Sequence, residues 1–284
     1  MRSQGAIAVG ALQFLPLDKE AGLAGVSNGE PLSDDDIASL IRNLRFEPLG
    51  LANDDRDFRI SIASAQDKTA LLNTANGWLK PIGTAVTTHT LKPAIGMLEK
   101  GMDLRDSVAN EHICMSICAA LGLSVAKTQI LTFEDQTVLS VKRFDRTWTD
   151  DGRLLRIPQK DFCQILSVPS ALKYQRDGGP GVLDILGVLR ESDTPDYDRA
   201  TFLKTQMVFW LLCASDGHAK NYLIRLREGG GSTSRRFTMY FPFNRSSVMG
   251  KLAKIEASCL CHTQMADIIG LILLREGTLM RLPR

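Results

Sequence analysis

Little in the amino-acid sequence points to a membrane, secreted or nucleic-acid-binding protein. No apolar run approaches the ~20 residues of a membrane-spanning helix, and the first residues lack the apolar core of a secretory signal. The 34 Lys and Arg residues nearly balance 32 Asp and Glu residues, and the net charge of +2 gives no argument for direct contact with DNA. The six cysteines show no spacing typical of a disulfide framework in a chain of 284 residues. We therefore expect a cytoplasmic protein with no membrane partner.

The hydrophobic pattern divides the chain into two textures. Apolar and polar residues alternate at 58–62, which predicts a strand, and at 125–133 and 137–141, which predicts a hairpin. Residues 69–72 and 87–93 also predict strands. Beyond residue 146 the apolar residues recur with helical spacing instead. A strand-rich half followed by a helix-rich half predicts an α+β protein with two lobes.

Two helices are predicted within the strand-rich half. Ser33 caps the first helix, whose early turn is acidic, as suits the positive end of a helix dipole. The second helix spans residues 107–121. Its predicted apolar face comprises Val108, Ile113, Ile117, Cys118 and Leu121.

A short polar loop separates two apolar segments in the second half of the chain. Asp216 ends one apolar run, Gly217 follows it, His218 and Lys220 form a basic pair, and Asn221 precedes the next apolar run. Phosphoryl transfer uses such a layout, with an Asp that orients the hydroxyl nucleophile and an Asn that holds a metal. An ordinary turn between a helix and a strand explains the same residues equally well. The loop by itself leaves both interpretations open.

Two further stretches are candidate phosphate-binding elements only if a phosphate site is expected nearby. The small-residue turn at residues 63–68 can bring backbone N–H groups close to phosphate oxygens, although a plain hairpin explains it too. Lys92 lies near the end of a predicted strand, where a lysine is ordinarily solvated. These stretches support a kinase only in combination with others.

The combination is specific. The motifs in chain order are Asp-Phe-Arg-Ile-Ser-Ile-Ala-Ser-Ala-Gln-Asp-Lys-Thr-Ala-Leu-Leu at 57–72, Thr-His-Thr-Leu-Lys-Pro at 88–93, Val-Lys-Arg-Phe-Asp-Arg at 141–146, Lys-Tyr-Gln-Arg-Asp-Gly-Gly-Pro-Gly at 173–181 and Ser-Asp-Gly-His-Ala-Lys-Asn at 215–221. With these motifs the chain resembles the HipA family, the bacterial kinase toxins of type II toxin–antitoxin pairs. The resemblance implies a two-lobed protein-kinase-like fold, with a strand-rich N-lobe and a helical C-lobe, and serine/threonine kinase activity that uses ATP and Mg²⁺.

The resemblance also implies a role for individual residues. Asp216 aligns with the catalytic Asp, Asn221 with the metal-binding Asn, and Lys92 with the lysine that neutralises the nucleotide phosphates. Glu111 is a candidate partner for Lys92. Ser61 aligns with the serine whose autophosphorylation inactivates family members by ejecting the phosphate loop. The other implied nucleotide-binding residues are Ala63, Ser64, Ala65, Gln66, Asp67 and Lys68 in the phosphate loop, Lys142, Arg143 and Phe144 beside the adenine, and His218, Ala219, Lys220 and Asn221 in the catalytic loop.

The sequence departs from the family pattern in two places. Ser64 stands where the family usually has glycine, and a side chain there hinders close backbone approach, so we expect weaker nucleotide binding. The family also has a Thr-Pro-Leu-Tyr-Asp segment whose Asp holds the catalytic magnesium, but no Asp occurs between Arg225 and Met265. Since metal binding and positioning dominate phosphoryl transfer, this difference predicts little or no kinase activity in the chain as written.

A change of reading frame would explain the missing Asp. Permitted codons for the residues after Ser234 can be read in a shifted frame as Thr-Pro-Leu-Tyr-Asp, so we hypothesise that residues from 235 to 284 are out of frame. Resequencing the locus tests this hypothesis. The expected segments are a remnant of an N-terminal region at 1–56, a kinase-like N-lobe with the phosphate loop at 57–145, an incomplete helical C-lobe with the catalytic loop at 146–228, and a divergent tail at 229–284.

Two functions remain open from the sequence. The first is a kinase toxin that transfers the ATP γ-phosphate to a protein hydroxyl and arrests growth, with an aminoacyl-tRNA synthetase as the family precedent for the substrate. The second is an inactive pseudokinase or gene remnant that at most binds ATP or a HipB-like antitoxin. The expected partners are this helix-turn-helix antitoxin and a protein substrate. The sequence shows no helix-turn-helix of its own, so we expect DNA to be contacted only through the antitoxin.

Overall fold

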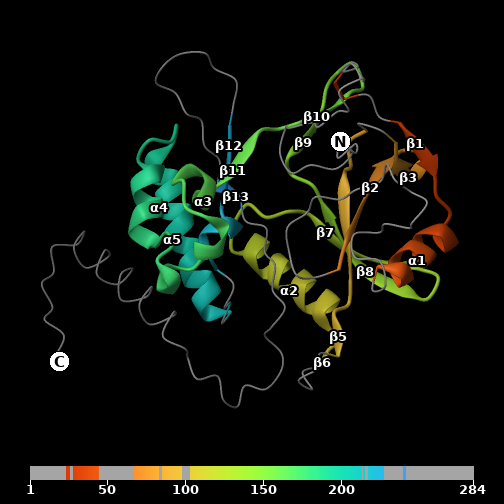
Figure 1. The fold of residues 1–284 in the computed structure, drawn as a ribbon, viewed down its shortest axis with the longest axis horizontal. Helices are drawn as coiled ribbons and strands as arrows, with labels where there is room; N and C mark the ends of the chain where they lie inside the picture. The colour runs from red at the N-terminus through yellow and green to blue at the C-terminus, as the bar shows by residue number, and fades with distance from the viewer. Residues whose placement is uncertain are drawn as a thin grey trace, which may run out of the picture. The chain divides into compact units, whose positions relative to one another are not determined.

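The computed structural model describes residues 24–25, 28–44, 67–82, 85–97, 103–212, 214, 217–226 and 239–240. Its chain separates into two compact units (Figure 1). The strand-rich unit comprises Met1–Ile117 with Ala126–Gln159, and the helical unit comprises Cys118–Val125 with Lys160–Arg284. The four segments expected from the sequence stay a prediction.

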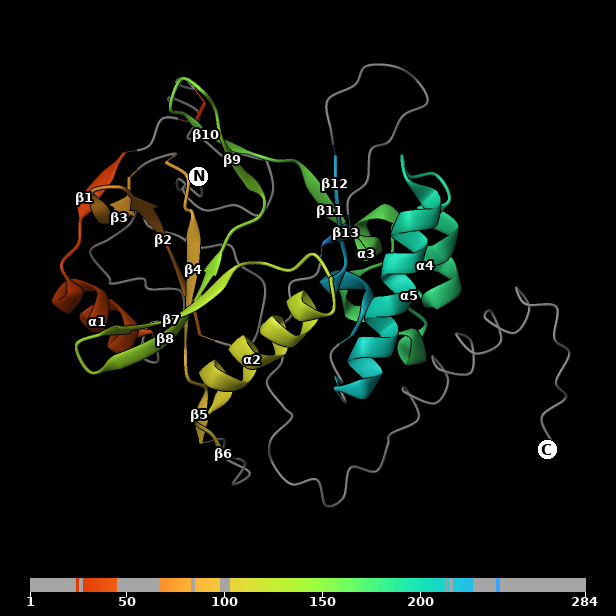
Figure 2. The ribbon, with the colours of Figure 1, turned by 180° about the vertical axis from the view of Figure 1, so that it is seen from behind.

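An antiparallel six-stranded sheet forms the strand-rich unit, in the order β1-β3-β2-β4-β8-β7 (Figure 2). The strands are β1 (Gly29–Pro31), β2 (Thr69–Thr74), β3 (Gly77–Pro81), β4 (His89–Pro93), β7 (Thr128–Phe133) and β8 (Gln136–Lys142). The strands predicted at 69–72 and 87–93 and the predicted hairpin are confirmed. The edge strand β1 was not predicted, because three residues that include a proline are too few to show an apolar–polar alternation.

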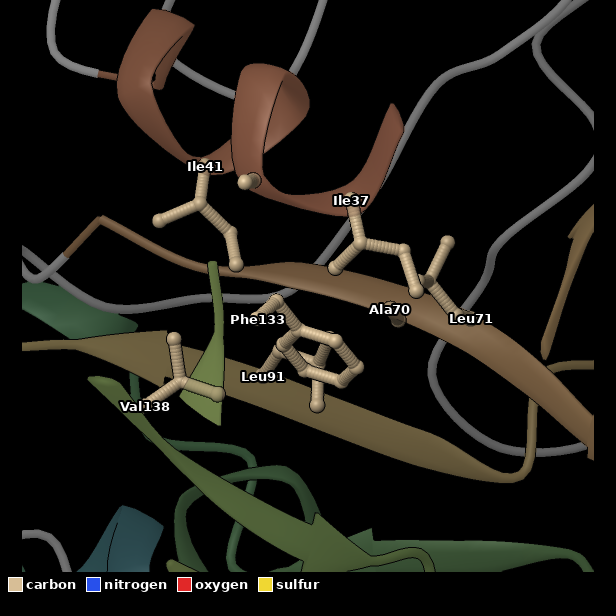
Figure 3. Close-up of a cluster of buried hydrophobic side chains, with 8 residues drawn as sticks. Ile37, Ile41, Ala70, Leu71, Leu91, Phe133 and Val138 are labelled. Atoms are coloured by element: carbon tan, nitrogen blue, oxygen red, sulfur yellow. The ribbon is translucent and has the colours of Figure 1, made fainter. Parts of the chain in front are cut away.

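Helix α1 (Asp34–Asn43) covers one face of this sheet. The Ser33 hydroxyl accepts a hydrogen bond from Asp36 N at 3.2 Å, and the Asp36 carboxylate accepts one from Ser33 N at 2.9 Å. These reciprocal bonds satisfy backbone donors that every helix start leaves open, so the predicted cap is confirmed. Ile37 and Ile41 point from α1 toward the sheet (Figure 3), and they pack in one buried cluster with Ala38, Ala70, Leu71, Leu91, Phe133 and Val138.

Helix α2 (Ser107–Ala120) forms where the sequence predicts it, but only some residues of its predicted apolar face are buried. Val108 and Cys118 are buried, whereas Ile113 exposes 56% of its surface and Ile117 exposes 37%. Leu121, just beyond the helix, is also exposed. The buried stripe instead runs along positions 108, 111, 115 and 118, which helical spacing places on one side. This stripe includes a charged residue, Glu111, which is buried.

Two small antiparallel sheets complete the strand-rich unit. One pairs β5 (Gly96–Met97) with β6 (Asp103–Leu104), and the other pairs β9 (Arg146–Trp148) with β10 (Leu154–Arg156). A turn joins the last two strands, and Gly152 adopts a φ of 79° in it, which glycine tolerates without strain. Strands therefore continue beyond residue 146, where the sequence suggested helical spacing.

The helical unit contains α3 (Phe162–Ile165), α4 (Val182–Leu189) and α5 (Pro195–Leu211), and α4 packs beside α5 (Figures 1 and 2). Three short 3₁₀ turns are η1 (Ser170–Leu172), η2 (Gln175–Asp177) and η3 (Ala219–Asn221). A small sheet has the order β11-β12-β13, with β11 (Gln159–Asp161), β12 (Leu223–Arg225) and β13 (Met239–Tyr240). Among the helices that the structure describes, none is long and apolar enough to cross a bilayer.

Candidate functional site

A buried ion pair joins the centre of the sheet to α2. Lys92 Nζ on β4 lies 2.6 Å from Glu111 Oε1, and the two side chains expose only 12% and 4% of their surfaces. Bonds between ionised groups at this distance are short and strong. The predicted partner of Lys92 is therefore confirmed, and Glu111 is buried because it meets this lysine.

The backbone fixes both members of the pair. β4 lies between β2 and β8, and Lys92 is in register with Leu139 of β8. Just beyond β4, Ile95 N donates a hydrogen bond to Ser107 Oγ at 3.0 Å. Because Ser107 is the first residue of α2, this bond ties the start of the helix to the end of the strand. Glu111 lies one turn further along the helix.

Lys68 brings a second cation to this place. It immediately precedes β2 and is buried. Burial and, to a smaller extent, the charge of Lys92 lower the pKa of its ammonium group to about 8, although Glu111 and Asp67 act in the opposite direction. Lys68 and Lys92 thus both interact electrostatically with the buried Glu111. This excess of positive charge suits an anion that carries several charges, such as a chain of phosphates.

Most of the predicted phosphate loop cannot be compared with this cluster. Ser61, Ala63, Ser64, Ala65 and Gln66 lie outside the described residues, as does the strand expected at 58–62. At the end of the loop, Asp67 is exposed and Lys68 is buried. The chain therefore enters β2 with its lysine directed inward.

In the segment expected beside the adenine, the arginine side chain bonds other residues of the strand-rich unit. The Arg143 guanidinium donates to Asp145 Oδ1 at 3.1 Å and to Oδ2 at 2.9 Å, and Nη1 reaches Thr87 Oγ1 at 3.3 Å. Its backbone N–H donates to Thr88 O at 2.7 Å. Lys142 is the exposed last residue of β8, and Phe144 is half-buried. Both the side chain and the backbone N–H of Arg143 are therefore engaged inside the strand-rich unit.

Asp145 is the centre of a buried charge network that sequence reasoning did not single out. Its carboxylate also lies 2.8 Å from Arg146 Nη1 and accepts a bond from Gln159 Nε2 at 3.3 Å. Burial raises the pKa of Asp145, but Arg143 and Arg146 outweigh that effect and the net pKa is lowered. Burial, aided by the charge of Arg143, lowers the pKa of Arg146 to about 9. The motif at 141–146 contains these residues, and only their contacts reveal their role.

In the helical unit, the catalytic-loop segment is held by the motif at 173–181 and the residues just before it. Ala219 N donates to Lys173 O at 3.3 Å, and Lys220 Nζ donates to Ser170 Oγ at 3.2 Å. The ring of His218 meets that of Tyr174 edge to face, with centroids 5.0 Å apart. The structure thus brings two of the five sequence motifs together, which their separation in the chain did not reveal.

Asn221 ends the 3₁₀ turn η3 and is half-buried. Its backbone N–H donates to His218 O at 2.9 Å, which closes the turn. Asp216 lies outside the described residues, so the distance between the predicted catalytic Asp and Asn221 stays open. The predicted residues His218, Ala219, Lys220 and Asn221 do form one compact turn.

No cluster of three His, Cys, Asp or Glu side chains able to hold a metal occurs within the part of the chain that the structure describes. Mg²⁺ does not require such a cluster, because it keeps several waters and is held by one or two protein groups together with substrate phosphates. The carboxamide oxygen of Asn221 is chemically suited to that limited role. Nucleotide phosphates and water would supply the other oxygen ligands.

Comparison with known proteins identifies the fold and the family. The model of the HipA-like C-terminal domain matches residues 60–239, which is more than half of the chain. This chain belongs to the HipA family. The match includes β4, α2 and the catalytic-loop segment, so the Lys92–Glu111 pair and Asn221 lie within the HipA-like domain.

Two curated proteins resemble the HipA-family chain over most of its length. Y4mE of Sinorhizobium fredii, named as a candidate kinase, is 34% identical over 225 residues, which cover 78% of this chain and 52% of that protein. The serine/threonine-protein kinase toxin HipA of Shewanella oneidensis is 27% identical over 242 residues, covering 81% of this chain and 53% of that protein. The chain thus spans about half the length of the curated relatives that it matches.

A solved structure supports the fold. The complex of Shewanella oneidensis HipA with HipB and operator DNA contains a chain that matches with a TM-score of 0.62 and 23% identity, covering 82% of this chain and 54% of that one. At this identity the likeness speaks for the fold alone. The expected α+β, protein-kinase-like HipA fold is confirmed.

Proposed function

We propose that this HipA-family chain binds ATP and is built to transfer its γ-phosphate to a serine or threonine hydroxyl of a protein. The observation that carries this proposal is the buried Lys92–Glu111 pair, which lies 2.6 Å apart beside Lys68. In protein kinases a strand lysine neutralises nucleotide phosphates, and a helix glutamate holds that lysine in place. The strand and helix origins of Lys92 and Glu111 agree with this division of roles.

Other residues take the roles that the family pattern implies. Asp216 would orient the attacking hydroxyl and accept its proton, and Asn221 would supply a carboxamide oxygen to Mg²⁺. When bound, Mg²⁺ would neutralise charge on the phosphates. Lys220, fixed at Ser170, would add a positive charge next to Asn221. Ser61 would be the site of inactivating autophosphorylation, because a phosphate of about −1.5 to −2 charges disfavours a loop packed near nucleotide phosphates.

The proposed partners follow from the relatives. Shewanella oneidensis HipA occurs in a complex with HipB and operator DNA. We propose a HipB-like antitoxin as the partner of this chain, with DNA contacted through that antitoxin. The near-balance of charge, +2 overall, gives no electrostatic argument for direct DNA binding by this chain. The proposed consequence of phosphorylation is growth arrest through a translation component.

One observation favours a second candidate function. The absence of Asp between Arg225 and Met265 leaves no residue at the expected position of the second metal ligand. A chain without that ligand would bind ATP, or the antitoxin, without transferring phosphate efficiently. This alternative is a pseudokinase that keeps the nucleotide contacts of the strand-rich unit.

Calorimetry of ATP binding to the purified chain, with and without Mg²⁺, tests the binding step. Lys92→Ala should weaken ATP binding about tenfold or more, because a charge-assisted bond to phosphate is lost. Lys127→Ala is the matched control, since Lys127 is exposed and precedes β7. Equal binding by both variants would contradict the assignment of Lys92.

Transfer of labelled phosphate separates the two candidates. Autophosphorylation or protein phosphorylation that disappears in Asp216→Ala would establish the kinase. ATP binding without any transfer in the wild-type chain would establish the pseudokinase. Mass spectrometry of the labelled chain would show whether Ser61 carries the phosphate.

A further inference from the structure

Tyr222 contacts the catalytic-loop segment at two places. Its backbone directly follows Asn221, while its hydroxyl lies close to Gly217, where an added Cβ would stand 3.3 Å from it. The ring is 1% exposed. Phe202 meets it edge to face and Phe209 stacks against it, with centroids 5.2 and 6.2 Å away. The phenol therefore spans the inside of the loop between Gly217 and Asn221.

Gln206 of α5 holds the polar end of this ring. Its Nε2 donates to the Tyr222 hydroxyl at 2.7 Å, and both side chains are buried. Phe202 and Phe209 fix the plane of the ring by contact, but neither can hydrogen-bond the hydroxyl. Removal of this bond takes one polar partner from a buried hydroxyl, which costs free energy and favours a shift of the hydroxyl. Gln206 thus helps to hold the hydroxyl close to Gly217.

We propose that Gln206 is a positioning residue that acts through Tyr222 to set the geometry of Asn221. The chain of contacts is short: α5 places Gln206, Gln206 places the Tyr222 hydroxyl, and Tyr222 is covalently next to Asn221. This inference rests on the proposed function, because it gives Asn221 its role toward Mg²⁺. Its structural part, the order of the Gly217–Asn221 turn, can be measured without any ligand.

The first test compares Gln206→Met with Thr205→Val. Methionine keeps the length of the glutamine side chain and removes the donor. Thr205 is the neighbouring buried residue of α5, and its hydroxyl bonds Thr201 O at 2.8 Å, away from Tyr222. Both variants lose one buried hydrogen bond of the same helix, but only Gln206→Met loses the bond to Tyr222.

Two quantities are read from each variant. Amide hydrogen exchange at Asn221, measured by NMR on the ligand-free chain, reports the bond from Asn221 N to His218 O. The Mg²⁺ concentration at half-maximal enhancement of ATP binding reports the metal ligand. In Gln206→Met we expect faster exchange at Asn221 and a half-maximal Mg²⁺ concentration about three- to tenfold higher, the size of effect that one hydrogen bond produces. Thr205→Val should change neither quantity, although its melting temperature falls.

The proposal is overturned if Gln206→Met and Thr205→Val show the same exchange at Asn221. If the wild-type chain binds no ATP, the proposed function fails, and hydrogen exchange still decides the positioning role.

Discussion

The strand-rich unit and the helical unit hold their candidate site residues in different ways. In the first, Lys92 and Arg143 are fixed by buried carboxylates at 2.6 and 2.9 Å. In the second, the turn that ends at Asn221 is held by ring contacts and by bonds to uncharged groups: Tyr222 bonded to Gln206, Tyr174 against His218, and Lys220 bonded to the Ser170 hydroxyl. Ion pairs fix the residues of the strand-rich unit that are proposed to meet phosphates, whereas packing and neutral hydrogen-bond partners fix the proposed metal ligand of the helical unit.

This difference predicts which kind of substitution should destabilise each unit. A buried ion pair depends on keeping both charges, because the partner left behind is unpaired in a poorly solvated place. A packed aromatic contact depends on volume, because the interior has few voids and little freedom to adjust. Isosteric loss of charge should therefore damage the strand-rich unit, and one added methyl group should damage the helical unit.

The largest expected effect is the loss of charge at Asp145. Asp145→Asn keeps the shape and leaves Arg143 and Arg146 without their carboxylate, so we expect the free energy of unfolding to fall by about 3–5 kcal/mol. Urea denaturation would measure this change. Asp135→Asn is the matched control, because Asp135 forms an exposed pair with Arg42 and should cause no measurable loss. A loss of similar size in both variants would break the proposed contrast.

A smaller effect is expected from one methyl group at Gly217. A Cβ there would lie 2.9 Å from Phe209 Cδ2, and that ring is stacked on Tyr222. Gly217→Ala should therefore destabilise the chain by about 1–3 kcal/mol through overpacking. Gly187→Ala serves as the control, since Gly187 lies within α4 with nothing close to the new atom. That change should stabilise the chain by about 1 kcal/mol, and thermal unfolding of both variants would reveal the opposite signs.

The last expected effect is a pH dependence that belongs to the strand-rich unit. The pKa of Lys68 is about 8 in the folded chain and 10.5 in the unfolded one, so the unfolded chain binds more protons between these values. The cost of burying its charge is present below pH 8 and is relieved as the pH rises through this window. The free energy of unfolding should therefore rise with pH there, and Lys68→Met should remove that part of the rise. Lys127→Met, at an exposed position, should retain it; a rise of the same size in wild type and Lys68→Met would contradict the burial of this charge.

Much of the fold could be predicted because its signals are local. The alternation in β7 and β8 and the Ser33 cap belong to short stretches, and each forms as expected. Helix α2 shows the limit of such reasoning. Apolar residues lie on two sides of this helix. The side that contains Glu111 is the buried one, because Glu111 pairs with Lys92. That choice depends on Lys92, 19 residues earlier, and no helical periodicity contains it.

The candidate site could be predicted only as far as family resemblance assigned its residues. Lys92 and Asn221 followed from motifs, and Glu111 was a reasonable guess that the structure confirms. Gln206 and Asp145 were missed, because each acts through contacts with residues elsewhere in the fold. The sequence offered two signals: a glutamine directly before the apolar run at 207–212, and an Asp between the arginines at 143 and 146.

The sheet order also has a consequence for the order of folding. β2 with β3, and β7 with β8, form hairpins closed by short turns, so these contacts are local and form quickly. β4 pairs with β2 on one side and with β8 on the other, and Lys92 is matched with Leu139 far along the chain. Because loop-closure entropy opposes such distant pairing, β4 should join the two hairpins late. Lys92 is carried on β4, so a ligand that requires this lysine selects chains whose sheet is complete and stabilises them against unfolding.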